Sequence, residues 1–90
     1  MPTYCKADGV LAEELDGQAA IVDPQGAELI TLNPVGSLVW SLLDGQREVD
    51  HIVTTVVEEC GPVDRATVAL DVRTFLSELV SLGLIVEASP

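Results

Sequence analysis

The sequence offers few side chains that could carry out catalysis. His51 is the single histidine, and it falls on the polar side of a predicted helix, where neither a metal site nor a Cys-His nucleophile has a second partner. Glu13-Glu14 and Glu58-Glu59 are adjacent carboxylates, and adjacent residues point apart on a strand or a helix. We therefore expect an exposed histidine, no general acid/base pair and no enzyme activity.

Other chemical sites are also missing from the sequence. Cys5 and Cys60 lack the spacing of metal ligands, and no glycine-rich phosphate loop is present. We therefore expect neither a metal nor a cofactor. No signal peptide is recognisable, and no apolar stretch is long enough to cross a membrane. These features predict a cytoplasmic protein with free thiols and no membrane partner.

Charge and composition limit the class of protein. Fifteen acidic residues stand against four basic ones, for a net charge of -11, and such a field repels phosphate backbones. Nucleic acid is therefore not expected as a partner. The acidity either keeps a small apolar domain in solution or attracts a basic partner, and we favour the first. Ninety residues, 48% of them hydrophobic, predict a single domain over residues 1–90 with an ordered core from about 10 to 86.

The first third of the chain is predicted to form a three-stranded antiparallel meander. Its strands are expected at Val10–Leu15, Gln18–Asp23 and Ala27–Leu32. Asp16-Gly17 is a typical hairpin turn, and Asp-Pro-Gln-Gly at 23–26 suits a second one. The residues before Val10 have no periodicity, so we expect a loose lead-in there.

Three helices are predicted to follow the meander. Asn33 can accept hydrogen bonds from the free N–H groups of a helix that begins at Pro34 and ends at Leu43 before Asp44-Gly45. Helical spacing of valine and isoleucine predicts a second helix over 48–60. Asp64 is the natural N-cap of a third helix that runs to about Leu82, and 84–87 forms a short apolar tail.

The apolar surface of the third helix is wider than a simple core-facing stripe. The helix carries Val68, Val72, Phe75, Leu79 and Leu82, flanked by Ala69, Leu76 and Val80. Either the sheet and the other helices cover all of this surface, or another molecule covers its edge, and the pattern leaves both open. Trp40 and Phe75, as the large aromatic residues, are expected to contribute most to the core.

The order of three strands and three helices can be matched to a family through short segments along the chain. These are Leu15-Asp16-Gly17, Leu32-Asn33, Gly36, Val39-Trp40, Leu42-Leu43-Asp44-Gly45, Ile52-Val53, Asp71-Val72, Phe75-Leu76, Leu79 and Gly83-Leu84. They resemble the PqqD-like proteins, also called RiPP recognition elements, from about residue 10 to residue 86. The resemblance implies an α+β, winged helix-turn-helix-like fold with a three-stranded antiparallel sheet followed by three helices.

The same resemblance implies a non-catalytic function. Such domains bind the leader segment of a ribosomally made precursor peptide and present it to modifying enzymes. A free-standing chain of this size is similar to the leader-binding proteins of lasso-peptide biosynthesis, which work with a separate leader peptidase and a cyclase. The expected partners are therefore a leader peptide, the peptidase and possibly the cyclase.

The resemblance also implies where the leader lies, between the third strand and the third helix. An unpaired strand edge can accept an extended peptide through main-chain hydrogen bonds. The residues carried over are Glu28, Leu29, Ile30 and Thr31 on the strand and Val68, Ala69, Asp71, Val72, Phe75 and Leu76 on the helix. Arg65 and Arg73 could pair with acidic leader residues, although ordinary exposed arginines are at least as good an interpretation.

Two alternatives belong to other functional classes. A winged-helix DNA-binding regulator would share the fold, but a helix that sets Arg65 and Arg73 against Asp64, Asp71 and Glu78 is not a phosphate-binding surface. A structural subunit could use the same open strand edge to dimerise. Peptide and DNA binding assays and sedimentation would separate the three.

Overall fold

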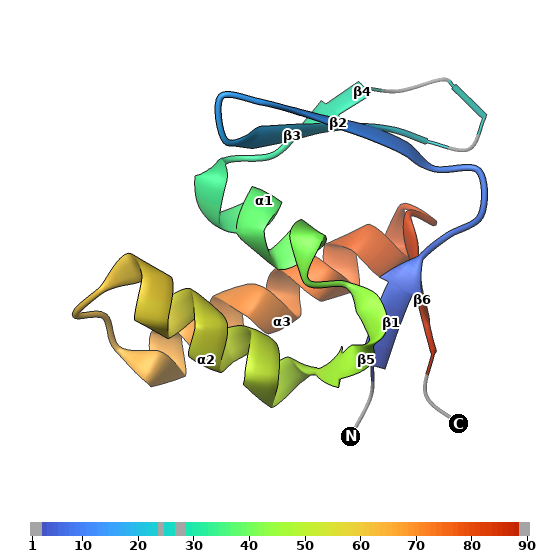
Figure 1. The fold of residues 1–90 in the computed structure, drawn as a ribbon. Helices are drawn as coiled ribbons and strands as arrows, with labels where there is room; N and C mark the ends of the chain where they lie inside the picture. Colours follow the sequence, from blue (N-terminus) through green and yellow to red (C-terminus); the bar gives the residue numbers. More distant parts are fainter. Residues whose placement is uncertain (1–2, 24, 27–28, 89–90) are drawn as a thin grey trace.

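The computed structural model describes residues 3–23, 25–26 and 29–88. Its elements are, in chain order, β1 (Thr3–Lys6), β2 (Leu11–Leu15), β3 (Gln18–Val22), β4 (Leu29–Thr31), α1 (Pro34–Ser41), β5 (Asp44–Glu48), α2 (Val49–Cys60), α3 (Arg65–Ser81) and β6 (Ile85–Glu87). One sheet has the order β2-β3-β4 and lies over α1, and the other has the order β5-β1-β6 and lies beside the chain ends (Figure 1). The fold is α+β, as expected.

The predicted meander is confirmed in the described residues. β2 and β3 pair from Leu11–Val22 to Leu15–Gln18, and β3 pairs with β4 from Ala20–Thr31 to Val22–Leu29, all antiparallel. Asp16 and Gly17 join β2 to β3 with φ values of 54° and 80°, the left-handed conformations that a tight hairpin turn requires. Ala27 and Glu28, which we assigned to the third strand, lie outside the described residues.

The three predicted helices are also confirmed, with small shifts of their ends. Asn33 Oδ1 accepts a hydrogen bond from Gly36 N at 2.7 Å, and Pro34 takes the first helical position of α1. α1 ends at Ser41, earlier than predicted. Asp64 precedes α3 as expected, but its carboxylate accepts from the Thr67 hydroxyl at 2.8 Å and not from a backbone N–H.

The second sheet corrects two expectations. We predicted a loose lead-in before Val10 and an apolar tail after Gly83, but Thr3–Lys6 and Ile85–Glu87 are paired strands.

The strand β5 was not predicted from the sequence, because its residues DGQRE have no strand-like pattern. It begins where Asp44 Oδ1 accepts hydrogen bonds from the Gln46 and Arg47 N–H groups. These hydrogen bonds lower the pKa of Asp44 below its ordinary value, and the bond from the Gln46 N–H has the largest effect.

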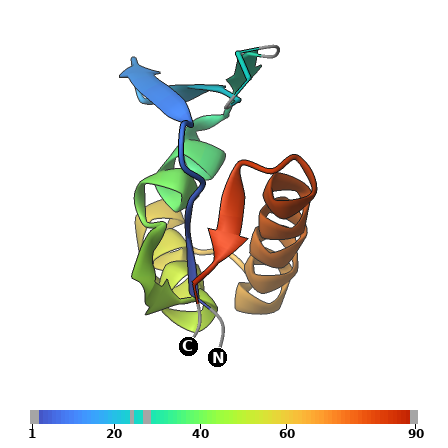
Figure 2. The ribbon, with the colours of Figure 1, turned by 90° about the vertical axis from the view of Figure 1, so that its right-hand side faces the viewer.

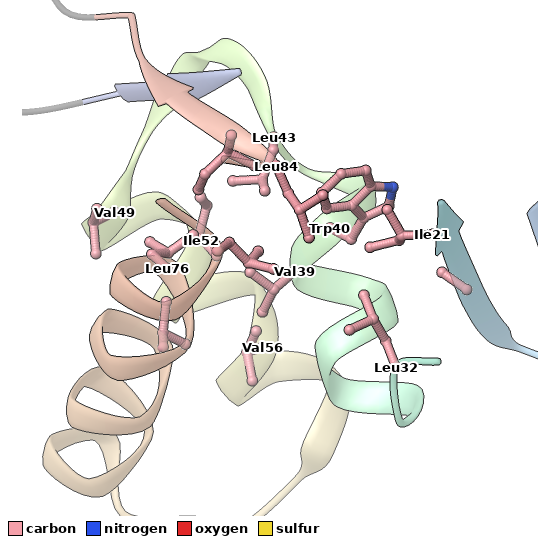
Figure 3. Close-up of a cluster of buried hydrophobic side chains, with 14 of the residues drawn as sticks. Ile21, Leu32, Val39, Trp40, Leu43, Val49, Ile52, Val56, Leu76 and Leu84 are labelled. Atoms are coloured by element: carbon pink, nitrogen blue, oxygen red, sulfur yellow. The ribbon is translucent and has the colours of Figure 1, made fainter. Parts of the chain in front are cut away.

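One hydrophobic core joins the meander to all three helices and to β6 (Figure 3). Ile21 and Leu32 enter it from the meander, Trp40 and Ile52 from α1 and α2, and Leu84 from the turn between α3 and β6 (Figure 3). Trp40 is 4% exposed, which confirms its place in the core. Lys6 Nζ lies 5.2 Å from the centre of the indole ring, at cation-π distance.

Phe75 is less buried than we expected, and part of the apolar surface of α3 is left uncovered. Phe75 is only half-buried, while Val80 and Leu82 are 44% and 51% exposed. The core therefore does not cover the whole apolar surface of α3. Figure 2 shows α3 beside β6, and it shows the meander above α1, at the end of the molecule away from the N and C termini.

Candidate peptide-binding groove

A groove with a volume of about 570 Å³ separates the end of β4 and the start of α1 from α3. Its lining is mostly apolar: Thr31, Leu32, Asn33, Val35, Gly36, Val39, Val56, Cys60, Val63, Val68, Asp71, Val72 and Phe75. Apolar concave sites with a few polar groups are typical of ligand-binding surfaces. The groove lies between the third strand and the third helix, where the family resemblance implies that a leader binds.

One face of α3 forms a wall of the groove. Val68, Asp71, Val72 and Phe75 follow the i, i+3, i+4, i+7 spacing that brings side chains to one face of a helix. Gly36 lets α1 approach this wall, because a Cβ atom there would lie 3.2 Å from Asn33 Oδ1 and 3.4 Å from Phe75 Cζ. A side chain at Gly36 would therefore crowd the floor of the groove.

β4 borders the groove with an open edge. In the described chain, β4 pairs only with β3. Leu32 N donates to Ala19 O at 2.8 Å, and bonded and non-bonded pairs alternate along an antiparallel ladder. The backbone N–H and C=O groups of Ile30, which lies opposite Ile21, therefore point toward β3. Leu29 and Thr31 consequently point their N–H and C=O groups to the open side, where an added strand could bond to them.

Ser37 ties this edge to α1. Its hydroxyl accepts a hydrogen bond from Ala19 N at 2.7 Å and lies 3.3 Å from Leu32 O, to which it donates. The side chain is 4% exposed and is the buried polar residue of the described core. The hydroxyl thus bridges β3 and β4 at the point where their direct ladder ends, and it holds the start of α1 against both strands.

Comparisons with known proteins agree with this geometry. Residues 18–85 match the family described as coenzyme PQQ synthesis protein D (PqqD). The chain belongs to the PqqD family. Its fold matches TbiB1, solved in complex with the TbiA(β) leader peptide, with a TM-score of 0.81 and 32% identity over 90% of this chain and 93% of that one. A search of curated proteins finds no match.

Membership of the PqqD family confirms the resemblance and the fold class inferred from the sequence. PqqD-like proteins are non-catalytic binding proteins, which agrees with the expectation that the chain is not an enzyme. Among the residues that the structure describes, no group of acidic, histidine or cysteine side chains could hold a metal ion. None of the described helices is long and apolar enough to span a membrane.

The structure brings together part of the predicted site of this PqqD-family chain. Thr31, Val68, Asp71, Val72 and Phe75 line the groove. Ala69, which we also assigned to the site, is half-buried on α3 outside the lining. Leu29 is 68% exposed and Ile30 half-buried on the adjoining strand. Glu28 lies outside the described residues.

Arg65, Arg73 and Leu76 lie away from the groove. Arg65 donates to Thr54 Oγ1 at 2.9 Å and to Asp50 O at 3.3 Å, so it binds α2. Arg73 is 4.0 Å from the Asp50 carboxylate and, with the 2%-exposed Leu76, lines a second hollow of about 490 Å³. Contact of these three residues with a leader remains a prediction.

The sequence interpretation missed several groove residues. Val35 and Val63 are 44% and 42% exposed, and they line the groove together with Cys60. Val63 lies in the turn between α2 and α3. In the sequence, the one sign of an apolar contact there was a valine placed between Pro62 and Asp64, outside the pattern of either helix. Val35 lies in the first turn of α1. Val35 and Val63 line the groove because of the way in which the ends of the helices pack together, which the sequence does not show.

Proposed function

We propose that this protein captures the leader segment of a ribosomally synthesised precursor peptide and delivers it to the leader peptidase and cyclase of a lasso-peptide pathway. The leader adds as a strand to the open edge of β4, and its alternate side chains enter the groove beside α3. The observation that carries the proposal is the outward-facing backbone of Leu29 and Thr31 beside a groove of about 570 Å³. The leader complex of TbiB1 supports it.

The binding step can be tested with the synthetic leader of any precursor peptide that is co-encoded with this protein. Fluorescence anisotropy should show saturable binding to the wild type. Val63→Trp should block it, because Val63 is exposed and lines the groove. Leu70→Trp is the matched control, since Leu70 is 66% exposed on α3 and is not part of the lining. Equal affinity of the two variants would place the leader outside the groove.

Cysteine reactivity gives an independent measurement on the unmutated chain. Cys60 lines the groove and is exposed, whereas Cys5 lies in β1 and is half-buried; both are free thiols. A bound leader should slow alkylation of Cys60 and leave that of Cys5 unchanged. Unprotected Cys60 in a saturated complex would argue against the proposed path. The buried Val72 and Leu76, 3% and 2% exposed, are poorer test sites because their truncation also weakens the core.

Delivery requires a second surface that meets the peptidase. The outer face of the meander carries a cross-strand row of Leu11, Val22 and Leu29, in which both leucines are 68% exposed. Leu15, 70% exposed, lies on the same face. A leader strand beside β4 would extend this face with its own side chains, so this apolar surface is where we place the peptidase.

The delivery surface can be tested separately from leader capture. Leu11→Glu should leave leader affinity unchanged, because Leu11 lies on β2, away from the groove, and should slow cleavage of the precursor by the peptidase of the pathway. Ala12→Glu on the neighbouring position adds the same charge to the same strand but on the opposite face. Equal cleavage rates with the two variants would exclude the outer face as the docking surface.

A further inference from the structure

The groove contains one carboxylate among apolar side chains. Asp71 lies within the α3 stripe of Val68, Val72 and Phe75, in a position where a purely core-facing stripe would have an apolar residue. Its side chain is exposed, and among the described residues it has no hydrogen-bond or ion-pair partner. The groove therefore presents an uncompensated negative charge to whatever occupies it.

None of the four basic residues of the chain compensates this charge. Arg47 pairs with Asp44 at 2.6 Å, Arg65 donates to Thr54 and Arg73 lies 4.0 Å from Asp50. Lys6 lies over the Trp40 ring. Because the net charge is -11, the field of the whole chain adds to the local negative charge. A side-chain cation that pairs with Asp71 would therefore have to come from the ligand.

We propose that Asp71 makes the groove selective for peptide segments that place a lysine or arginine against it between apolar residues, and that it rejects acidic residues there. This inference rests on the proposed capture of a leader peptide and specifies its chemistry. Once a peptide occupies the groove, its apolar side chains and the apolar walls exclude water on either side of the carboxylate, so a cation there forms a stronger charge-assisted contact than on an open surface. An acidic side chain would meet an unpaired like charge, which is how binding sites reject wrong partners.

An unbiased peptide library tests the inference without knowledge of the natural leader. Random 20-residue peptides displayed on phage are selected on the wild type, and clones are kept only if Val63→Trp abolishes their binding. We expect these groove-dependent peptides to be enriched in lysine or arginine at one spacing from apolar residues. The best peptide is then synthesised for affinity measurements at about physiological salt.

Two charge variants separate a local contact from the general field. Asp71→Asn should weaken binding about fivefold, the upper end of the range for one exposed charge pair, whereas Glu78→Gln should leave it nearly unchanged. Glu78 is exposed on the same helix outside the groove, and its replacement changes the net charge equally. Asp71→Lys should bind the peptide whose basic residue is replaced by glutamate better than it binds the original.

The outcomes distinguish this inference from the proposed function. Groove-dependent peptides without a preferred basic residue, or equal effects of Asp71→Asn and Glu78→Gln, would overturn the selectivity and leave peptide capture intact. A library that yields no peptide sensitive to Val63→Trp would overturn capture in the groove, and the selectivity with it.

Discussion

Trp40 contributes the largest aromatic side chain of the core. It is 4% exposed on α1, next to Val39, which lines the groove. Trp40→Ala should lower the free energy of unfolding by ~3–5 kcal/mol, because a large aromatic truncation leaves a cavity. Urea denaturation monitored by far-ultraviolet circular dichroism measures this change in stability, because its signal comes from secondary structure and not from the indole that the substitution removes. A variant that melts like the parent but binds leader poorly would assign Trp40 to the binding site.

Ser37 is a residue whose small polar group has a larger expected effect than its size suggests. Ser37→Ala removes the acceptor of the Ala19 N–H and the donor to Leu32 O, which leaves buried polar groups unpaired at a cost of ~1–3 kcal/mol. Denaturation gives the stability, and hydrogen exchange at the Ala19 amide should become faster.

Ser41→Ala is the matched control for this change. Ser41 is on the same helix and its hydroxyl donates to Leu38 O at 2.7 Å, but the contact is exposed. Its loss should change the stability by less than ~0.5 kcal/mol. Similar losses at Ser37 and Ser41 would mean that the bridge between β3 and β4 contributes little.

At the scale of elements, β4 is a short edge strand in which some backbone N–H groups point to the open side and others point toward β3. The N–H groups of Leu29 and Thr31 point outward, whereas that of Ile30 faces β3. Addition of a leader strand should slow exchange at Leu29 and Thr31, since a newly paired N–H is protected only in the complex. Ile30 is the internal control, because its partner is present in both states. Unchanged exchange at Leu29 and Thr31 in a saturated complex would contradict strand addition.

The whole molecule carries a charge that separates peptide binding from DNA binding. With a net charge of -11 and both arginines of α3 directed to α2, no described surface gathers cations for a phosphate backbone. We expect saturable anisotropy changes with the leader and none with a random 20-base-pair duplex at physiological salt. Saturable duplex binding without leader binding would favour the regulator alternative.

The same charge bears on the dimerising alternative. Two copies joined along their β4 edges would bring two strongly acidic molecules together, which is unfavourable without counterions. Sedimentation velocity should therefore show a monomer, with a small mass increase on addition of leader. A dimer that the leader dissociates would mean that self-pairing competes for the same edge.

Local patterns in the sequence were sufficient for much of the fold. Asn33-Pro34 specified the start of α1 because capping and proline geometry depend on neighbouring residues alone. Asp16-Gly17 likewise specified the first hairpin, and helical spacing identified α2 and α3. The lack of a second histidine or a metal-ligand pattern was also readable without coordinates. Together with the family resemblance, these features indicated a binding protein with a peptide site between the third strand and the third helix.

Tertiary structure decided the features that depend on contacts distant in sequence. The strands β1, β5 and β6 pair with one another although they are far apart in the sequence. A short strand such as DGQRE has no periodicity from which this pairing could be predicted. Arg65 and Arg73 turned toward α2 because Asp50 and Thr54 lie within reach only after the helices pack. Val35 and Val63 became groove residues for the same reason. A hydrophobic pattern tells which residues avoid water, but the packing of the helices decides whether they meet the core or face an open groove.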